Sequence, residues 1–281
     1  MRVLYFFCLL FVSVGAMAQS SSPRDLMLKM LTACEDNRAG KFTLRSVERE
    51  INGKITESSM IVKYQVKPKK LYLLLVDPNA GTEVLFREGE IEDKMLVNPS
   101  GFPFVNLKLS PFSSLVRRDN HHTIYQIGFD YISSIIRYYL NVYGENFYSY
   151  LSIKDTVNWD HHTCIHLVCN FKEFETILYT VKPNETVTNI AEKYHLNDYS
   201  ILVLNPMISD FNEVHAGQII QIPNFYNRRV DFYMDNITFL PLIQEIHDNK
   251  GLFERYELKS FIANPSFAPD EFTPEFTEYS F

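Results

Sequence analysis

Histidine and cysteine side chains gather in one short segment of the chain, from His161 to Cys169. His162, Cys164 and His166 alternate, so an extended strand places all three on one face, where their nitrogen and sulfur atoms are the ligands that zinc prefers. Three ligands along one strand lie too far apart to close a tetrahedral site, and the sequence contains no CxxC or HExxH pair. We therefore expect no metal site and no cofactor here, only a half-buried strand.

A second polar cluster, Arg117 to His122, reads Arg-Arg-Asp-Asn-His-His. These groups suit an anionic headgroup, but such a run is more often a solvated loop, which is what we expect. The sequence lacks Gly-x-Ser-x-Gly, a phosphate loop and a dinucleotide fingerprint. The acidic residues between Glu88 and Asp93 define no glycosidase pair without geometry. We therefore expect no catalytic residues and no enzyme.

Two short helices are predicted in the last third of the chain. Apolar residues from Val187 to Tyr194 recur at the i, i+3, i+4, i+7 spacing of one buried helix face, and Glu185 belongs to their polar start. Asp198 or Ser200 caps a second helix. That helix ends at Asn205-Pro206, because proline cannot continue it.

Two short strands flank this helix pair. The first ends at Lys182-Pro183-Asn184, and Ala216-Gly217-Gln218 makes the turn into a closing strand over Ile219 to Ile222. The order strand, helix, helix, strand within residues 178–224 resembles a LysM module, a small domain that binds peptidoglycan and chitin. We expect its two strands to pair antiparallel.

The LysM resemblance implies a shallow sugar groove between the loop after the first strand and the loop after the second helix, here residues 182–189 and 205–210. Backbone amides, asparagine and a few apolar groups suit an N-acetylated sugar. The family usually has glycine at the position of Asn184, and asparagine best tolerates the left-handed conformation after glycine. The implied glycan-binding residues are Asn184, Glu185, Thr186, Val187, Asn205, Pro206, Met207 and Ile208. The alternative is a LysM fold that serves only as a spacer.

A secretory leader is predicted at the N-terminus. Arg2 precedes an apolar run over residues 3–14, and the small residues that follow predict cleavage between Ala18 and Gln19. The run is too short for an anchor, and Cys8 lacks the neighbours of a lipoprotein cysteine. We expect a periplasmic or otherwise secreted envelope protein that does not span a membrane. Losing Arg2 changes the net charge from −7 to −8, which disfavours nucleic acid as a partner.

Three cysteines remain after this cleavage: Cys34, Cys164 and Cys169. In an oxidising compartment an odd count permits one disulfide and one free thiol, or no disulfide. Cys164 and Cys169 differ by five positions and face opposite sides of a regular strand, so we expect no bond between them. Cys34 can pair with either one.

The rest of the chain has enough apolar residues for a larger domain, since 46% of the sequence is hydrophobic. Asn52-Gly53 predicts a tight hairpin between two long strands. Ser110-Pro111 starts a short helix, and helices are also expected over residues 24–37 and 123–142. The predicted strands cover residues 41–50, 54–65, 71–76, 83–86, 94–97, 102–109, 148–154, 161–174, 229–235, 241–247 and 252–261.

This larger domain is similar to the lipoprotein-carrier fold of the LolA/LolB type and to secreted bacterial proteins that share it. The resemblance is carried by KYQVKPKKLYLLLVDP, TEVLFREGEIEDKMLVNP and DNITFLPLIQEIHDNKGLFERYELKSFIANPSF. It implies an α+β fold in which a strongly curved antiparallel sheet, a half-barrel, wraps helices and receives acyl chains in its concave interior. With the LysM module inserted between two strands, the expected division is 1–18 (leader), 19–177, 178–224 (LysM) and 225–281.

Two functional hypotheses follow. In the first, a noncatalytic protein is held on peptidoglycan or another N-acetylglucosamine glycan by LysM, while the curved sheet binds a lipid, lipoprotein or protein partner. In the second, the sheet domain is a cell-wall-modifying enzyme that LysM concentrates on its substrate. A concave cluster of carboxylates or histidines favours the second, and none is recognisable in the sequence. The 22 Phe and 17 Tyr suit an apolar cavity or an ordinary core, and we expect the first function.

Overall fold

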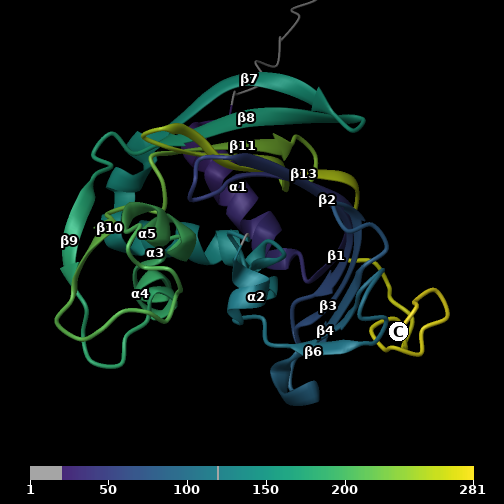
Figure 1. Ribbon diagram of the computed structural model, residues 1–281. Helices are drawn as coiled ribbons and strands as arrows, with labels where there is room; N and C mark the ends of the chain where they lie inside the picture. The colour runs from purple at the N-terminus through teal and green to yellow at the C-terminus, as the bar shows by residue number, and fades with distance from the viewer. Residues whose placement is uncertain (1–20, 119) are drawn as a thin grey trace, which may run out of the picture.

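The computed structural model describes residues 21–118 and 120–281 and shows a curved sheet that wraps several helices (Figure 1). The predicted leader, residues 1–18, lies outside the described residues. The large sheet contains β1 (Ala39–Arg49), β2 (Ile55–Gln65), β3 (Lys70–Asp77), β4 (Glu83–Arg87), β5 (Met95–Asn98), β6 (Leu107–Leu109), β7 (Leu151–Trp159), β8 (His162–Asn170), β11 (Arg229–Asp235), β12 (Pro241–Asp248) and β13 (Gly251–Ala263). A small second sheet pairs β9 (Thr176–Thr180) with β10 (Ile219–Pro223).

The helices are short and lie mainly on the concave side of the sheet (Figure 1). They are α1 (Pro23–Asp36), α2 (Ser114–Arg117), α3 (Asp130–Tyr143), α4 (Val187–Tyr194) and α5 (Asp198–Leu204), with 3-10 turns η1 (Ile91–Asp93), η2 (Ile124–Gln126) and η3 (Gly144–Tyr150). Among the described residues, no helix has the length and apolarity needed to cross a bilayer.

The eleven strands of the large sheet run antiparallel in the order β6-β5-β4-β3-β2-β1-β13-β12-β11-β8-β7. The last strand, β13, pairs with β1 and thereby joins the two ends of the chain in the middle of the sheet. Because β6 and β7 do not pair with each other, the sheet stays open. The predicted α+β class, with a curved antiparallel sheet, packing helices and a small βααβ unit, is confirmed.

Helix α1 fills one end of the concave side because its sequence supplies both a start signal and an apolar face. The Ser22 hydroxyl accepts from the Asp25 backbone, and the Asp25 carboxylate accepts from Ser22, with Pro23 in the first turn. Met27 and Met30 are then fully buried against the sheet. The predicted helix over residues 24–37 is confirmed within one residue at each end.

The structure corrects two predicted helices. The expected helix over residues 123–142 is interrupted at Gly128, whose φ of +111° suits glycine and whose added Cβ would lie 2.9 Å from the Tyr64 ring. The chain therefore forms η2 and then a separate helix, α3. The short helix expected from Ser110-Pro111 begins later, with Ser113 at its N-cap, because Ser110 is used for a preceding turn.

The predicted strand over residues 102–109 is also too long. Only Leu107–Leu109 pairs with the sheet, while Phe102 and Phe104 are 88% and 79% exposed. Pro103 between them has no N–H to give to a strand partner, which explains why the ladder starts after it. The other predicted strands are present: β11 has its predicted bounds, and the rest have shifted ends.

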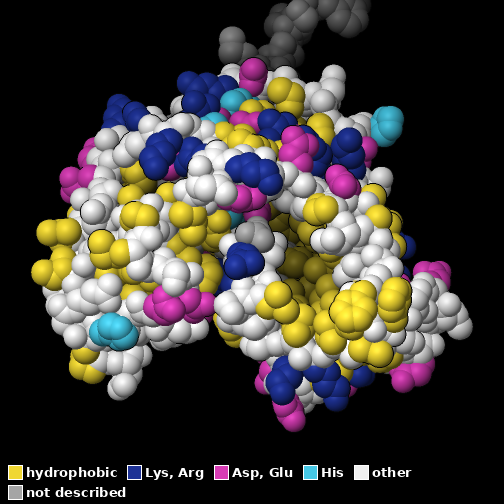
Figure 2. Space-filling model, in the orientation of Figure 1, with side chains coloured by type: hydrophobic (Ala, Val, Ile, Leu, Met, Phe, Trp, Pro, Cys, Tyr) yellow, Lys and Arg dark blue, Asp and Glu magenta, His cyan; other side chains and the backbone are white. Residues whose placement is uncertain are grey.

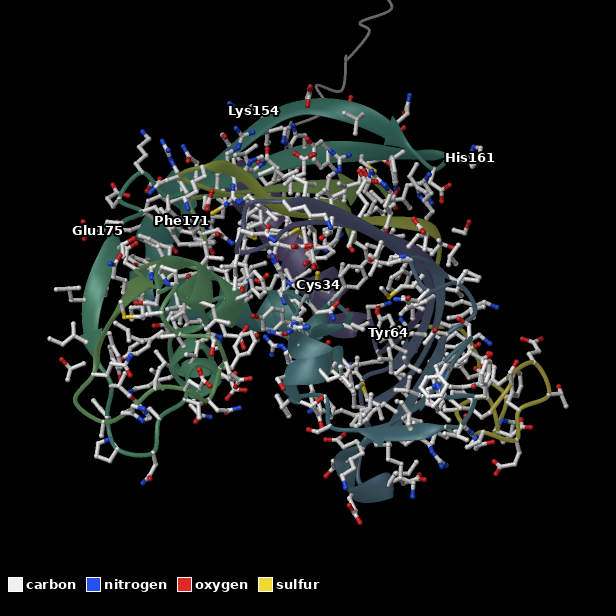
Figure 3. The ribbon with its side chains drawn as sticks, in the orientation of Figure 1. Cys34, Tyr64, Lys154, His161, Phe171 and Glu175 are labelled. Carbon is white, nitrogen blue, oxygen red and sulfur yellow. The ribbon has the colours of Figure 1, made fainter. Side chains whose placement is uncertain are left out.

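All three described cysteines are buried and free, so the alternative without a disulfide is the one that the structure has. Cys34 lies on α1 inside the curve of the sheet (Figure 3). Burial raises the pKa of the Cys164 thiol to about 11 and also raises the pKa of Cys34 and Cys169. These thiols are therefore packing residues rather than nucleophiles.

The small βααβ unit lies between β8 and β11, which are direct neighbours in the large sheet. Its strands pair antiparallel, as predicted, with Ile220 opposite Tyr179. Its core includes Val187 and Ile201, both fully buried. The cap of α5 is Asn197 rather than the predicted Asp198 or Ser200, and its side-chain oxygen accepts from the backbone N–H groups of Tyr199 and Ser200.

Candidate functional site

The concave face of the large sheet encloses a cavity of about 420 Å³. Figure 2 shows its hollow, lined mainly by hydrophobic side chains. Strand alternation explains the lining, because every second residue of a strand points to the same face. The aliphatic lining residues include Leu44, Met60, Leu73, Leu75, Val84, Val97, Ile132 and Ile135.

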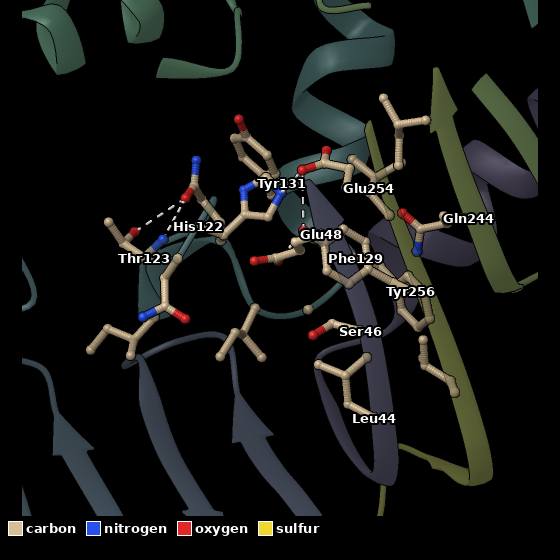
Figure 4. Close-up of a pocket in the computed structure, with 18 of the residues that line it drawn as sticks. Leu44, Ser46, Glu48, His122, Thr123, Phe129, Tyr131, Gln244, Glu254 and Tyr256 are labelled. Carbon is tan, nitrogen blue, oxygen red and sulfur yellow. Dashed lines mark hydrogen bonds and ion pairs between the residues drawn. The ribbon is translucent and has the colours of Figure 1, made fainter. Parts of the chain in front are cut away.

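The character of the lining changes from apolar to polar along the paired strands β1 and β13. Leu44 stands opposite Leu258, and the next inward pair, two residues along, is Ser46 with Tyr256. The pair after that is Glu48 with Glu254, so two carboxylates face each other at one end of the cavity (Figure 4). Like charges at opposite positions repel, so this end requires hydrogen-bond donors.

Glu254 is fully buried and receives these donors from several elements. His121 Nδ1 lies 2.8 Å and His122 Nε2 3.2 Å from its Oε2 atom, and the Tyr226 hydroxyl donates to Oε1 at 3.3 Å. Burial alone raises the pKa of Glu254, but the two histidines more than offset this effect and hold it well below its usual range. Glu254 therefore stays a carboxylate inside the protein.

Glu48 and His122, at the same end of the cavity, can still form hydrogen bonds with a ligand. Glu48 accepts from the Tyr256 hydroxyl at 2.6 Å and from the His121 backbone N–H at 3.4 Å. His122 Nδ1 is buried and has no hydrogen-bond partner within the described part of the chain. Burial lowers the pKa of His122, yet the neighbouring Glu254 charge gives a net rise. In its protonated form, His122 is a free donor beside a carboxylate.

The polar run Arg117 to His122, predicted to be a solvated loop, is solvated only in part: Arg118 and Asn120 are exposed, whereas Arg117 and His121 are buried, so the prediction is wrong for these two side chains. Arg117 is 2% exposed and lies 2.9 Å from Asp198 of the βααβ unit, with its guanidinium 4.0 Å from the Phe211 ring centre. His121 is 1% exposed and stacks on Tyr199 of the same unit. The counterions and rings come from distant parts of the sequence, so no local signal reveals this burial.

These contacts dock the βααβ unit against the cavity. Asn197, the cap of α5, directs its amide to Glu254 at 3.3 Å. Its backbone neighbour Asp198 binds Arg117 with one oxygen and Thr188 with the other. Phe253 of β13 belongs to the core of the unit, and its ring lies 4.5 Å from that of His121. The unit and the polar end of the cavity therefore share side chains.

Several of the predicted glycan-binding residues form hydrogen bonds or packing contacts within the βααβ unit instead of facing solvent. The Glu185 carboxylate accepts from Tyr179 and from the Lys182 backbone, and Thr186 caps α4. Asn205 is buried and bonds the backbone of Ile201 and Gln221. The remaining buried members of the predicted set are Val187 and Ile208.

The other predicted members face solvent. Asn184 has a φ of +64°, the left-handed conformation expected from its sequence position, and it is exposed. Pro206 is exposed, and Met207 is 84% exposed. The Val187 backbone N–H donates to the Phe211 carbonyl at 2.8 Å and thereby ties the region of the first loop to the end of the second.

The histidines of β8 bind carboxylates on neighbouring strands rather than gathering with the cysteines. His162 Nδ1 lies 3.1 Å from Asp235, and His166 lies between Asp155 and Asp231. His161 sits at the outer tip of the β7–β8 hairpin (Figure 3). The strand is buried over about half of its length, but His166 to Cys169 are buried consecutively rather than in alternation.

Comparison with protein families gives two matches. The family described as protein of unknown function (DUF1571) matches residues 40–199. The LysM domain matches residues 179–223, which confirms the LysM resemblance of the βααβ unit. No curated protein matches the chain.

Several solved structures align with most of the chain at low sequence identity. The complex of Pseudomonas aeruginosa MucA/MucB aligns with 89% of this chain and 60% of that chain, at 12% identity and a TM-score of 0.42. The lipoprotein LppX of Mycobacterium tuberculosis aligns with 86% of this chain and 95% of its own, at 10% identity and a TM-score of 0.40. A LolA superfamily protein of Nitrosomonas europaea aligns with 90% of this chain and 98% of its own, at 8% identity and a TM-score of 0.33. The chain spans about three fifths of the MucB structures that it matches.

We predict that Arg117→Ala lowers the free energy of unfolding by about 3 kcal/mol, because it leaves the buried Asp198 carboxylate without its counterion. Urea denaturation followed by circular dichroism measures this loss. Arg118→Ala is the matched control, because Arg118 is the next residue in the chain and its side chain is exposed. Equal stability of the two variants would show that the Arg117 ion pair does not hold the interface.

We predict a pH-dependent contribution from His122. Its pKa is raised in the folded protein, so its stabilising effect is complete below the unfolded value of about 6.5 and is lost as pH rises through the folded value. The stability difference between the parent protein and His122→Gln should therefore shrink as pH increases above about 6.5. His161→Gln, at an exposed position, is the control and should show no such trend. A difference that stays constant with pH contradicts the prediction.

Proposed function

We propose that this chain, which belongs to the family described as protein of unknown function (DUF1571), is a noncatalytic envelope protein that binds an acyl-chain ligand in its curved sheet and glycan through its LysM domain. The observation that carries the proposal is the cavity of about 420 Å³ with a mainly apolar lining. We also propose the secretory leader over residues 1–18, a periplasmic or otherwise secreted location, and domain limits at 178 and 224.

The cavity suits an acyl chain in size and lining. Its volume falls within the range of about 300–1,000 Å³ that is usual for small-molecule sites. Each methylene group moved from water into such an apolar space contributes about 0.8 kcal/mol. Aliphatic side chains such as Leu44, Met60 and Ile135 offer contact along its walls without polar groups that an acyl chain would leave unpaired.

The polar end of the cavity supports a ligand with a polar head. His122 Nδ1 can donate when protonated, and Glu48 can accept. A head group with both a donor and an acceptor, such as a hydroxyl or an amide, pairs with both. An unprotonated fatty-acid carboxylate meets repulsion from Glu48 and Glu254. These contacts favour an acyl chain attached to a neutral polar group.

The enzyme alternative deserves comparison, because the structure brings two carboxylates and a histidine together in a concave site. Glu254, however, is already bound by His121, His122, Asn197 and Tyr226. Its hydrogen bonds hold the βααβ unit against the sheet, and the neighbouring cavity is mainly apolar. This environment supports head-group binding rather than hydrolysis of a polar wall polymer.

The glycan part of the proposal rests on the LysM domain and on the exposed positions of its two loops. Asn184, Pro206 and Met207 offer an amide and apolar surface to an N-acetylated sugar. A single LysM copy has no second site to provide avidity, so association with peptidoglycan is weak and reversible. The docked interface keeps the glycan loops at a fixed position relative to the cavity.

We predict that filling the cavity abolishes acyl binding. Leu44→Trp should weaken binding of the fluorescent fatty acid cis-parinaric acid at least tenfold, measured by fluorescence titration at pH 5, where more of the probe is protonated. Ile55→Trp is the control, because Ile55 is 48% exposed at the start of β2. Val84→Phe offers a second filled cavity if Leu44→Trp does not fold. Equal binding by all folded variants places the probe elsewhere and contradicts the proposal.

We predict that the chain from Gln19 onward sediments with purified peptidoglycan sacculi and that the double variant Asn184→Ala, Met207→Glu loses at least half of the pelleted fraction. Point variants are preferable to deletion of the LysM domain, because deletion exposes Arg117 and Glu254. Leu178→Glu, at a 74% exposed position on β9, is the control. Unchanged sedimentation contradicts these binding residues. Release of soluble fragments from the sacculi favours the enzyme alternative.

A further inference from the structure

A second cluster of titratable side chains lies on the convex face of the large sheet, outside the cavity. Asp231 of β11 stands directly opposite Glu245 of β12, and His247 follows two residues later on the same face. Their neighbours Phe232, Gln244 and Ile246 point into the cavity, so strand alternation places these three on the other side. One ligand atom from each of the three lies within 4.8 Å of the others.

Two buried atoms in this cluster have no hydrogen-bond partner among the described residues. Asp231 is fully buried, and its Oδ2 atom is unpartnered, as is Nε2 of His247. His247 Nε2 lies 3.7 Å from Asp231 Oδ2 and 3.7 Å from Glu245 Oε2. These distances are too long for hydrogen bonds, and an unpaired buried polar group costs about 1–3 kcal/mol. No side chain in the described part of the chain therefore satisfies these atoms of Asp231 and His247 with a hydrogen bond.

The remaining oxygen of each carboxylate is held by other side chains. Asp231 Oδ1 lies 2.6 Å from His166 Nε2 and 2.5 Å from an Arg229 nitrogen. Glu245 Oε1 accepts from Arg255. Each carboxylate thus has one oxygen fixed and directs the other toward His247. Outer partners of this kind orient the ligands of metal sites.

We propose that Asp231, Glu245 and His247 bind one divalent transition-metal ion of the zinc type, with one ligand atom each and water at the open position. One imidazole nitrogen with two carboxylate oxygens is a donor set that zinc accepts, whereas calcium and magnesium prefer oxygen alone. Zinc ligands lie about 2.0–2.2 Å from the ion, so side-chain rotations would draw the three atoms closer together when the ion binds.

The ion would link β11 to β12 beside the point where the chain returns from the LysM domain. It would also offset the repulsion between Asp231 and Glu245, which stand opposite each other in the ladder. Arg229 and Arg255 already neutralise part of this charge, so the site binds less tightly than a site of free carboxylates. The sequence hides the site because its ligands lie on two strands and carry no motif spacing.

The test uses the untagged chain from Gln19 onward, stripped with a chelator and then titrated with zinc chloride by calorimetry. We expect one zinc ion per chain and at least tenfold weaker binding for His247→Gln. His215→Gln, at an exposed position in the LysM domain, is the control and should bind as the parent does. Circular dichroism verifies folding, and Glu245→Gln replaces His247→Gln if the latter is unfolded.

Each of the following outcomes overturns the proposal. The first is that the parent chain binds no zinc. The second is that a folded variant of His247 or Glu245 binds zinc as tightly as His215→Gln does. The third is that Cys164→Ser removes the binding, which would assign the ion to strand β8 with its histidines and cysteines. Magnesium chloride is titrated in parallel. Binding of magnesium with equal strength contradicts the nitrogen ligand and the zinc-type assignment.

Discussion

The buried carboxylate of Glu254 is the constraint on which the arrangement of the two domains depends. A charge in the protein interior is tolerated only when it is paired and hydrogen-bonded. Its donors come from the segment after α2, from the cap of α5 in the LysM domain and from Tyr226 at the return to the large sheet. These segments must converge for Glu254 to remain charged, and their convergence places the LysM domain against the sheet.

The same strands that carry Glu254 also define the cavity. Cross-strand pairs of β1 and β13 change from leucines to a serine–tyrosine pair and then to two carboxylates. A single register therefore sets both the apolar wall of the cavity and its polar end. A shift by one residue would turn every one of these side chains to the convex face. The β1–β13 pairing thus connects the two halves of the sheet and also positions the side chains of the proposed ligand site.

The docked LysM domain gives the protein one body with two proposed binding surfaces. Arg117 lies between Asp198 and Phe211, and Phe211 in turn bonds the backbone of Val187 beside the glycan loop. Packed and charged contacts of this kind leave little freedom for a hinge between the surfaces. A glycan held by the loops would fix the direction in which the cavity opens relative to the wall. This relation follows from the insertion of LysM between two neighbouring strands.

The sequence by itself determined the local elements and the LysM domain. Alternation and turn residues placed most strands, the Asn52-Gly53 hairpin and the left-handed turn at Asn184, because neighbours in the chain decide these features. Only the tertiary structure showed that Gly128 divides a helix beside Tyr64, that Arg117 and His121 are buried, and that Glu48 stands opposite Glu254. Each of these depends on strand register and on partners far apart in the chain. Burial, strand pairing and charge compensation depend on contacts between residues that are distant in the sequence, and local periodicity does not encode these contacts.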